Sequence, residues 1–396
     1  MLAHDRGRGL TTTQKPTGPF FIVGSERSGT TLLMAILGQH SRLAVPEVAW
    51  YYPRFRAFLH TYGDLADSAR FRTLVSEMIF GLKTPFFGLD LNPATIVDEL
   101  LARIETKTFA GAYGAILDLY ARALGKPRWG EKTPHNLFYV EEILADFPQA
   151  RFVHLVRDGR DVAVDQLRSA FGPRNVYAAA LLWRRTHEVA ARLRAKLPRD
   201  IWLDVRYEDL AARPEAIMRE VLQFLHEPWE PGVLEFYRGD IAQRRARTRD
   251  HRPLGQPVST DHVGLYRSHL SLHDQGVFNH VAGAGLREAG YASDVPPVSV
   301  SAEDAALYLE LDGRIRAATL DAPEGHIVYE SYNDWLIDQR EERRRRGLWS
   351  SAPAVAPRFE RVLDWDEEFL AGQRAPRKWK QYLAVKPRHH GSSLVL

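Results

Sequence analysis

The stretch PFFIVGSERSGTTLLMAILG, residues 19–38, joins a short apolar run, a glycine-bounded loop and an apolar periodic segment. The continuous apolar run over residues 19–23 predicts a buried strand of the kind found in parallel sheets. Residues 24–29 predict a turn, and residues 30–38 predict a helix that stops at a glycine. In such a unit the loop N–H groups and the positive end of the helix converge, so this stretch predicts an anion-binding site.

The loop itself, residues 24–31 (GSERSGTT), has the spacing of a P-loop. In nucleotide-hydrolysing P-loops a lysine follows the second glycine and reaches the terminal phosphates, whereas here that position is Thr30. A nucleoside triphosphatase is therefore disfavoured. The cation lies inside the loop instead, at Arg27. The residues expected to bind the anion are Arg27, Ser28, Gly29, Thr30 and Thr31.

Two further apolar runs predict strands at residues 151–156 and 201–207, and each is followed by a predicted helix. Residues 53–125 and 303–318 are predicted to be mostly helical. Strands that alternate with helices indicate βαβ units. The predicted fold is therefore α/β, with a central parallel sheet flanked by helices and a P-loop-type strand, loop and helix.

The domain organisation follows from changes in composition along the chain. Residues 1–18 form a polar leader, residues 19–295 the α/β domain, and residues 296–396 a partly helical C-terminal extension. The boundary is placed at the sequence Val-Pro-Pro that begins at Val295. The leader has no apolar segment like that of a signal peptide, and no run approaches the ~18 apolar residues of a membrane span. We therefore expect a cytoplasmic protein.

Composition excludes several kinds of site. The 396 residues include 53 Lys and Arg against 50 Asp and Glu, a net charge of +3, which argues against a nucleic-acid partner. Cysteine is absent, which excludes a disulfide framework, a thiolate metal site and a cysteine nucleophile. No His, Asp and Glu cluster has metal-ligand spacing, so no metal is expected.

Residues 25–31 resemble the 5′-phosphosulfate loop of the sulfotransferases, which use 3′-phosphoadenosine-5′-phosphosulfate (PAPS). The family loop carries a Lys or Arg followed by Ser-Gly-Thr-Thr, and Glu26 stands where proline is common. The resemblance covers residues 19–292. It is closer to the tyrosylprotein and bacterial branch than to the cytosolic small-molecule branch.

Residues 157–164 (RDGRDVAV) resemble the second motif of the family, in which an Arg and a Ser eight residues later hold the 3′-phosphate. The Arg position is Arg157, but the Ser position is Asp165. A carboxylate repels a phosphate dianion. Either Asp165 points elsewhere and a neighbour such as Arg168 or Ser169 replaces it, or the donor differs.

Three weaker matches follow in family order. Residues 129–135 resemble the segment with an active-site lysine, here Lys132. Residues 205–210 resemble the segment whose tyrosine lies near the adenine, here Tyr207. Residues 263–270 resemble the late Gly-x-Trp segment. The resemblance thus implies that Lys132 and Arg27 stabilise charge during in-line transfer, and that Tyr207 borders the donor.

The acceptor needs a general base, and two residues are candidates. Glu47 lies twenty residues beyond Arg27, nearly the offset of the base in tyrosylprotein sulfotransferases, and it is favoured. His135 is the alternative, because cytosolic sulfotransferases carry a histidine just after the Lys-Thr pair, where this chain has Pro134.

An arginine-rich segment, residues 244–252, allows two interpretations, a solvated face or a lid over the 3′-phosphate. The resemblance implies transfer of a sulfuryl group from PAPS to a hydroxyl or amine of a small molecule, carbohydrate, lipid or peptide, with adenosine 3′,5′-bisphosphate as product. Two other functions stay open. One is a P-loop kinase, and the other is a non-catalytic nucleotide-binding protein in which Asp165 marks a decayed donor site.

Overall fold

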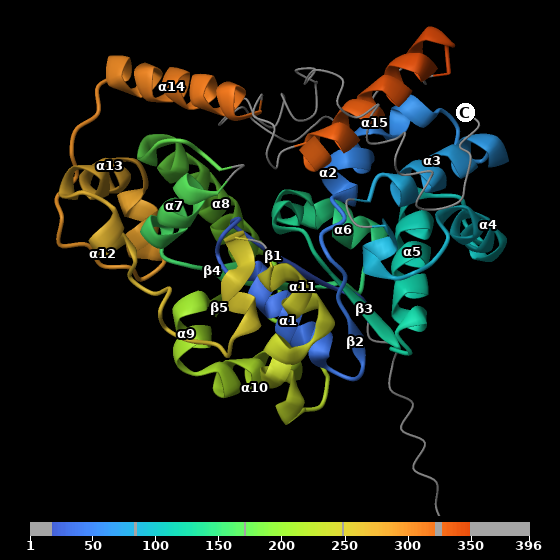
Figure 1. Ribbon diagram of the computed structural model, residues 1–396, viewed down its shortest axis with the longest axis horizontal. Helices are drawn as coiled ribbons and strands as arrows, with labels where there is room; N and C mark the ends of the chain where they lie inside the picture. The colour runs from blue at the N-terminus through green and yellow to red at the C-terminus, as the bar shows by residue number, and fades with distance from the viewer. Residues whose placement is uncertain (1–17, 83–84, 170–171, 248, 321–326, 349–396) are drawn as a thin grey trace, which may run out of the picture.

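A computed structural model of the chain describes residues 18–82, 85–169, 172–247, 249–320 and 327–348. Residues 1–17 of the predicted leader and residues 349–396 of the predicted extension lie outside the described residues. The described part is an α/β protein, as predicted, with a parallel sheet between layers of helices (Figure 1).

The sheet of the described residues has five parallel strands in the order β2-β3-β1-β4-β5. Strand β1 is central, and its Ile22 lies opposite Lys132 of β3 on one side and Val153 of β4 on the other. The carboxyl ends of all the strands meet at one edge, where open α/β sheets bind ligands. The bounds are β1 Phe20–Gly24, β2 Leu43–Ala44, β3 Arg128–Lys132, β4 Arg151–Val156 and β5 Trp202–Arg206.

Strand β1 is apolar at successive positions because both faces of the sheet are covered. Phe21 and Val23 join one hydrophobic core, whereas Phe20 and Ile22 join the other. The helices of the first face are α2 Tyr51–Phe55, α3 Ser68–Phe80, α4 Pro93–Arg103, α5 Phe109–Ala123 and α6 Val140–Asp146. Those of the second face are α1 Thr30–Gln39, α9 Tyr207–Ala212, α10 Pro214–Leu225 and α11 Asp240–Ala246.

A third apolar cluster lies beyond β4, at the left of Figure 1. It is built by α7 Gly159–Arg168, α8 Val176–Lys196, α12 Tyr266–His269 and α13 Leu272–Glu288. Short 3₁₀ helices connect the elements: η1 Arg56–Tyr62, η2 Pro85–Gly88, η3 Pro134–Tyr139, η4 Pro231–Arg238 and η5 Arg249–Gly255. None of the described helices is both long and apolar enough to cross a membrane.

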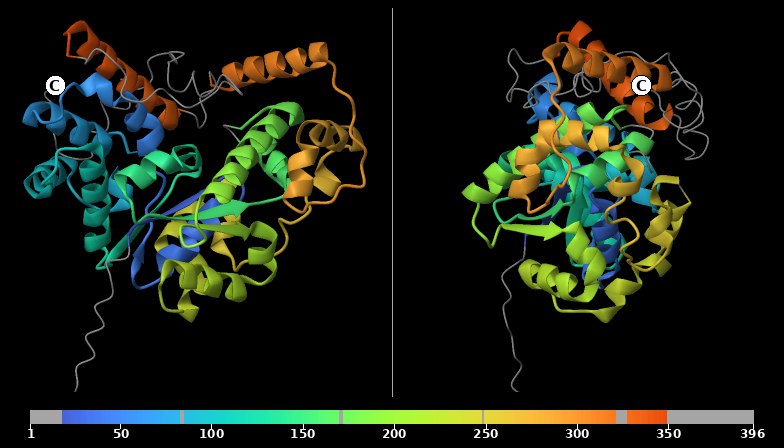
Figure 2. Two further views of the ribbon diagram at one scale, coloured as in Figure 1. Left: turned by 180° about the vertical axis from the view of Figure 1, so that it is seen from behind. Right: turned by 90° about the vertical axis from the view of Figure 1, so that its left-hand side faces the viewer.

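Two helices follow the predicted α/β domain, α14 Ala302–Leu320 and α15 Ile327–Arg345. Figure 2 shows them on the same side of the molecule over different helices, α14 beside α8 and α15 beside η1. The arginine run that ends α15 has a mixed role. Arg343 is buried against Glu77 of α3, whereas the next three arginines are exposed and pair with Glu341 and Glu342.

Candidate active site

The loop after β1 has the backbone of an anion cradle. Arg27 and Gly29 take left-handed φ angles of 67° and 96°. A Cβ on Gly29 would lie 2.6 Å from the Tyr207 ring, so only glycine fits between this ring and α1. Ser28 is fully buried, and its hydroxyl donates to the Ser25 carbonyl at 2.6 Å, which closes the turn.

Helix α1 begins directly behind this turn at Thr30, which is buried, and Thr31 beside it is half-buried. Its first turn has neither a side-chain cap from Gly29 nor an acidic residue. The first N–H groups of a helix have no partner within the helix, and the helix dipole is positive there. The loop and α1 can therefore bind a phosphate or sulfonate through the backbone.

Arg157 follows β4 and contacts the loop from the side. Its guanidinium is buried and donates from Nη1 to the Arg27 carbonyl at 2.7 Å and from Nη2 to the His262 carbonyl at 2.7 Å. It also lies 4.6 Å above the Tyr207 ring, which follows β5. The structure thus brings Arg157 and Tyr207 together beside the loop, as the two separate motifs suggested.

Asp165 does not point away from this site. Its Oδ2 accepts from Arg157 Nη1 at 2.6 Å. The two neighbours considered as replacements make no substitute phosphate site. The Ser169 hydroxyl is buried and donates to the Gln166 carbonyl, and Arg168 is exposed at the end of α7. In this structure Asp165 thus lies toward Arg157 rather than away from it.

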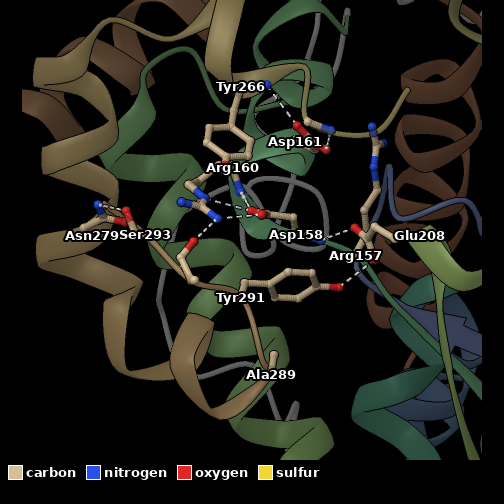
Figure 3. A network of polar contacts seen from close by, with 12 residues as sticks. Arg157, Asp158, Arg160, Asp161, Glu208, Tyr266, Asn279, Ala289, Tyr291 and Ser293 are labelled. Carbon is tan, nitrogen blue, oxygen red and sulfur yellow. Dashed lines mark hydrogen bonds and ion pairs between the residues drawn. The ribbon is translucent and has the colours of Figure 1, made fainter. Parts of the chain in front are cut away.

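A polar network holds the motif around Arg157 in place (Figure 3). Asp161 of α7 accepts from the backbone N–H groups of Gly264 and Tyr266. Glu208, next to Tyr207, accepts from the Asp158 N–H at 2.9 Å and from the Tyr291 hydroxyl at 2.9 Å. The carboxyl end of β4 is therefore tied both to the 263–270 segment and to the residues that follow β5.

The other side of the loop carries the second group of candidate residues. Lys132, the last residue of β3, is buried, and so are Glu47 and His135. His135 Nδ1 lies 3.8 Å from Oε1 of Glu26 in the phosphate loop, and its ring lies 4.7 Å from that of Trp50. Glu47 lies far from β3 in the sequence, but it is close enough to Lys132 for its charge to act on the pKa of that residue.

Two arginines that motif matching did not connect to Glu47 bind its carboxylate. Arg245 Nη2 lies 2.9 Å from Oε2, and Arg244 Nε lies 3.5 Å from Oε1. Both arginines belong to α11, in the segment predicted as a lid or a solvated face. The structure places them beside Glu47 and Lys132. No local sequence pattern pairs Glu47 with α11. The cluster of arginines in this segment predicts only a contact with some anionic group.

Burial shifts the pKa values of three residues on this side of the loop, and it raises that of Glu131 to about 7. Burial and the nearby Arg245 lower the pKa of Lys132 to about 8, against the attraction of Glu131, Glu47 and Glu26. The ammonium is therefore mostly protonated at neutral pH. Burial lowers the pKa of His135 to about 3, so the imidazole is neutral and a weak proton acceptor.

Glu131 is a buried carboxylate behind this group that sequence reasoning missed. Thr133 Oγ1 donates to Oε1 and Asn136 Nδ2 to Oε2, both at 2.5 Å. Thr133 Oγ1 in turn accepts from the Trp50 N–H at 3.3 Å. Glu131 therefore ties the segment after Glu47 to the end of β3. No sequence signal marks it, because three of the five residues of β3 are charged and the run does not predict a buried strand.

The site combines a backbone anion cradle, Arg27, a buried lysine and a buried carboxylate at the carboxyl edge of the sheet. Such a set can hold a doubly anionic group and neutralise charge that develops on it. Among the described residues, no three His, Asp or Glu side chains lie close enough to hold a metal ion.

Comparison with known proteins agrees with the motifs. Residues 19–231 match the profile described as the Sulfotransferase family. An uncharacterized protein of Aquifex aeolicus (strain VF5) is 30% identical over 229 residues, 56% of this chain and 27% of that protein. Protein-tyrosine sulfotransferase of Drosophila melanogaster is 26% identical over 224 residues, 54% of this chain and 39% of that protein. The chain thus spans well under half the length of these two relatives.

Among solved structures, the sulfotransferase domain from the Synechococcus PCC 7002 olefin synthase aligns with a TM-score of 0.49 at 20% identity. The alignment covers 71% of this chain and 98% of that domain.

Proposed function

Because the chain belongs to the sulfotransferase family, we propose that it transfers the sulfuryl group of PAPS, or of a donor that shares its 5′-phosphosulfate, to a hydroxyl or amine. One observation carries this proposal. Thr30 replaces the lysine that serves terminal phosphates, while Lys132 ends the strand directly beside β1. The cations of the site thus lie in and beside the loop, as a phosphosulfate requires.

In-line sulfuryl transfer leaves new negative charge on the departing 5′-phosphate, as phosphoryl transfer does on its leaving group. The N–H groups at the start of α1 and the side chain of Arg27 would hold this phosphate. The Lys132 ammonium would approach the oxygen that bridges phosphorus and sulfur. The nucleoside would extend toward β4 and β5, where Arg157 and Tyr207 lie together.

Glu47 is the proposed general base. His135 is a weaker choice because its low pKa makes it a poor proton acceptor. The Glu47 carboxylate forms ion pairs with Arg244 and Arg245, which occupy the oxygens that a general base needs. We expect these arginines to move toward the anionic donor when it binds, which frees Glu47 to accept the acceptor proton.

The acceptor class is proposed to be a hydroxyl, since relatives of this chain include protein-tyrosine sulfotransferases. The proposal is tested by following the origin of the transferred group. The full chain is incubated either with ³⁵S-labelled PAPS or with γ-³²P-labelled ATP, and with a tyrosine peptide, a phenol, a sugar and a lipid alcohol. Incorporation of ³⁵S alone supports the proposal, whereas ³²P incorporation alone would indicate a kinase.

A further inference from the structure

Arg157 commits three of the four N–H groups on its two terminal nitrogens to acceptors of the protein itself. Nη1 donates to both the Arg27 carbonyl and the Asp165 carboxylate, and Nη2 donates to the His262 carbonyl. Its positive charge is already matched by a carboxylate at 2.6 Å. The guanidinium therefore links the phosphate loop, α7 and the backbone at His262, and its charge is paired with that of Asp165.

Asp165 is the polar group of this pair that remains accessible. Its side chain is 17% exposed, whereas that of Arg157 is 3% exposed. Oδ2 accepts from Arg157, and among the described residues no donor binds Oδ1. The site therefore presents a negatively charged hydrogen-bond acceptor. The Arg157 guanidinium links this acceptor to the Arg27 carbonyl of the phosphate loop.

A carboxylate and a cation select opposite groups on a ribose. In dinucleotide-binding folds an acidic side chain accepts a hydrogen bond from a free ribose hydroxyl, and an arginine accommodates a phosphate at the same position. The reason is general, because a carboxylate can accept from a hydroxyl but repels a phosphate. Asp165 lies beside Arg157 and balances its charge. This position therefore suits a free ribose hydroxyl better than a phosphate.

We propose that Asp165 sets the donor specificity of this chain toward a nucleoside 5′-phosphosulfate with a free ribose hydroxyl, the chemistry of adenosine 5′-phosphosulfate, and against a 3′-phosphate. The inference rests on the proposed function, which places the nucleoside beside Arg157 and Tyr207. The inference concerns only the group on the 3′ position of the donor ribose. The proposed sulfuryl transfer is the same with either donor.

Binding of the two reaction products tests the inference without any acceptor. Isothermal titration of the full chain with adenosine 5′-monophosphate and with adenosine 3′,5′-bisphosphate gives two dissociation constants. The wild type is expected to bind the monophosphate at least as tightly as the bisphosphate. Asp165→Ser removes the charge and supplies a hydroxyl donor, so bisphosphate binding should tighten by about tenfold or more.

Asp165→Asn is the matched variant, since it keeps the size of the side chain and removes its charge. It should also improve bisphosphate binding, and the thermal unfolding midpoint of both variants checks that they fold. Wild-type binding of the bisphosphate about tenfold more tightly than the monophosphate would overturn the inference alone. Binding of neither nucleotide would overturn the proposed function, and the inference with it.

Discussion

Lys132 has the only pKa of the candidate site that lies just above neutrality, considering the residues the structure describes. Its burial at the end of β3 disfavours the charged form, while three carboxylates favour it. Its pKa of about 8 means that the ammonium is present at pH 7 and is lost as the pH rises further. A residue that stabilises charge on a leaving phosphate must keep this proton.

We therefore predict that kcat falls as the pH rises through about 8. Lys132→Arg keeps its charge at higher pH, so the alkaline fall should move upward even if kcat is lower. Lys132→Met should reduce kcat by roughly 10²-fold or more at pH 7, as is usual when a charge-stabilising donor is removed, and the difference from the wild type should narrow above pH 8. The measurement is kcat against pH for the three proteins. An alkaline fall at the same pH in Lys132→Arg would contradict the assignment.

Gly29 gives a second prediction. Its φ of 96° is strained for any side chain, and a Cβ would meet the Tyr207 ring at 2.6 Å. Gly29→Ala should displace the loop or the ring and weaken nucleotide binding by about tenfold or more, with a smaller loss of overall stability. Gly232→Ala is the control, since a Cβ there meets nothing within 4 Å. Unchanged nucleotide affinity in Gly29→Ala would show that the loop tolerates a shift.

Sequence reasoning succeeded for residues that lie within a motif and failed for those that meet across the chain. Arg27, Arg157 and Tyr207 each follow a predicted strand, so parallel topology alone gathers them at one edge. The ion pairs of Glu47 with α11 depend on a loop path that no local pattern encodes. Asp165 was recognised as a departure, but its contact with Arg157 required the structure.

Among the elements, α15 shows how the C-terminal region is fixed to the helices of the first face. Arg343 donates to both Glu77 and the Thr61 carbonyl, and the Tyr62 hydroxyl donates to Glu77. The side chains of Arg343 and Glu77 are only 10% and 5% exposed. Loss of one partner would leave the other charge buried and unpaired, which is strongly destabilising.

Arg343→Met is therefore expected to lower the free energy of unfolding by about 3–5 kcal/mol, measured by urea denaturation. The double variant Arg343→Met with Glu77→Gln should recover much of this loss, because it removes both charges. Arg344→Met is the control, since Arg344 forms an exposed pair with Glu341 and should change stability by less than about 1 kcal/mol. Equal losses in Arg343→Met and Arg344→Met would show that α15 is not anchored by this ion pair.

The predictability of the elements also varied with their composition. Strand β4 occupies the predicted residues, and β5 lies within the predicted range 201–207. Strand β3 was not predicted as a strand because three of its five residues are charged, although all five are buried. Helix α7 begins at Gly159, directly after Asp158, which caps it by accepting from the Arg160 N–H.

Over the whole molecule, the central position of β1 gives the candidate site its two sides. Strand β3 brings Lys132 to one side of the loop, and β4 with β5 brings Arg157 and Tyr207 to the other. The near-neutral net charge of +3 thus coexists with a cluster of buried cations at one edge. The sequence predicted this α/β architecture, because motif order and strand order are linked by parallel topology.

The central claim is that this edge binds a 5′-phosphosulfate and passes its sulfuryl group to an acceptor. It is tested most directly by incubating the full chain with a ³⁵S-labelled phosphosulfate donor and a hydroxyl compound that serves as sulfuryl acceptor. The account predicts labelled acceptor and desulfated nucleotide in equal amounts, and loss of both products in Arg27→Met. Release of nucleotide without labelled acceptor, or unchanged transfer in Arg27→Met, would contradict it.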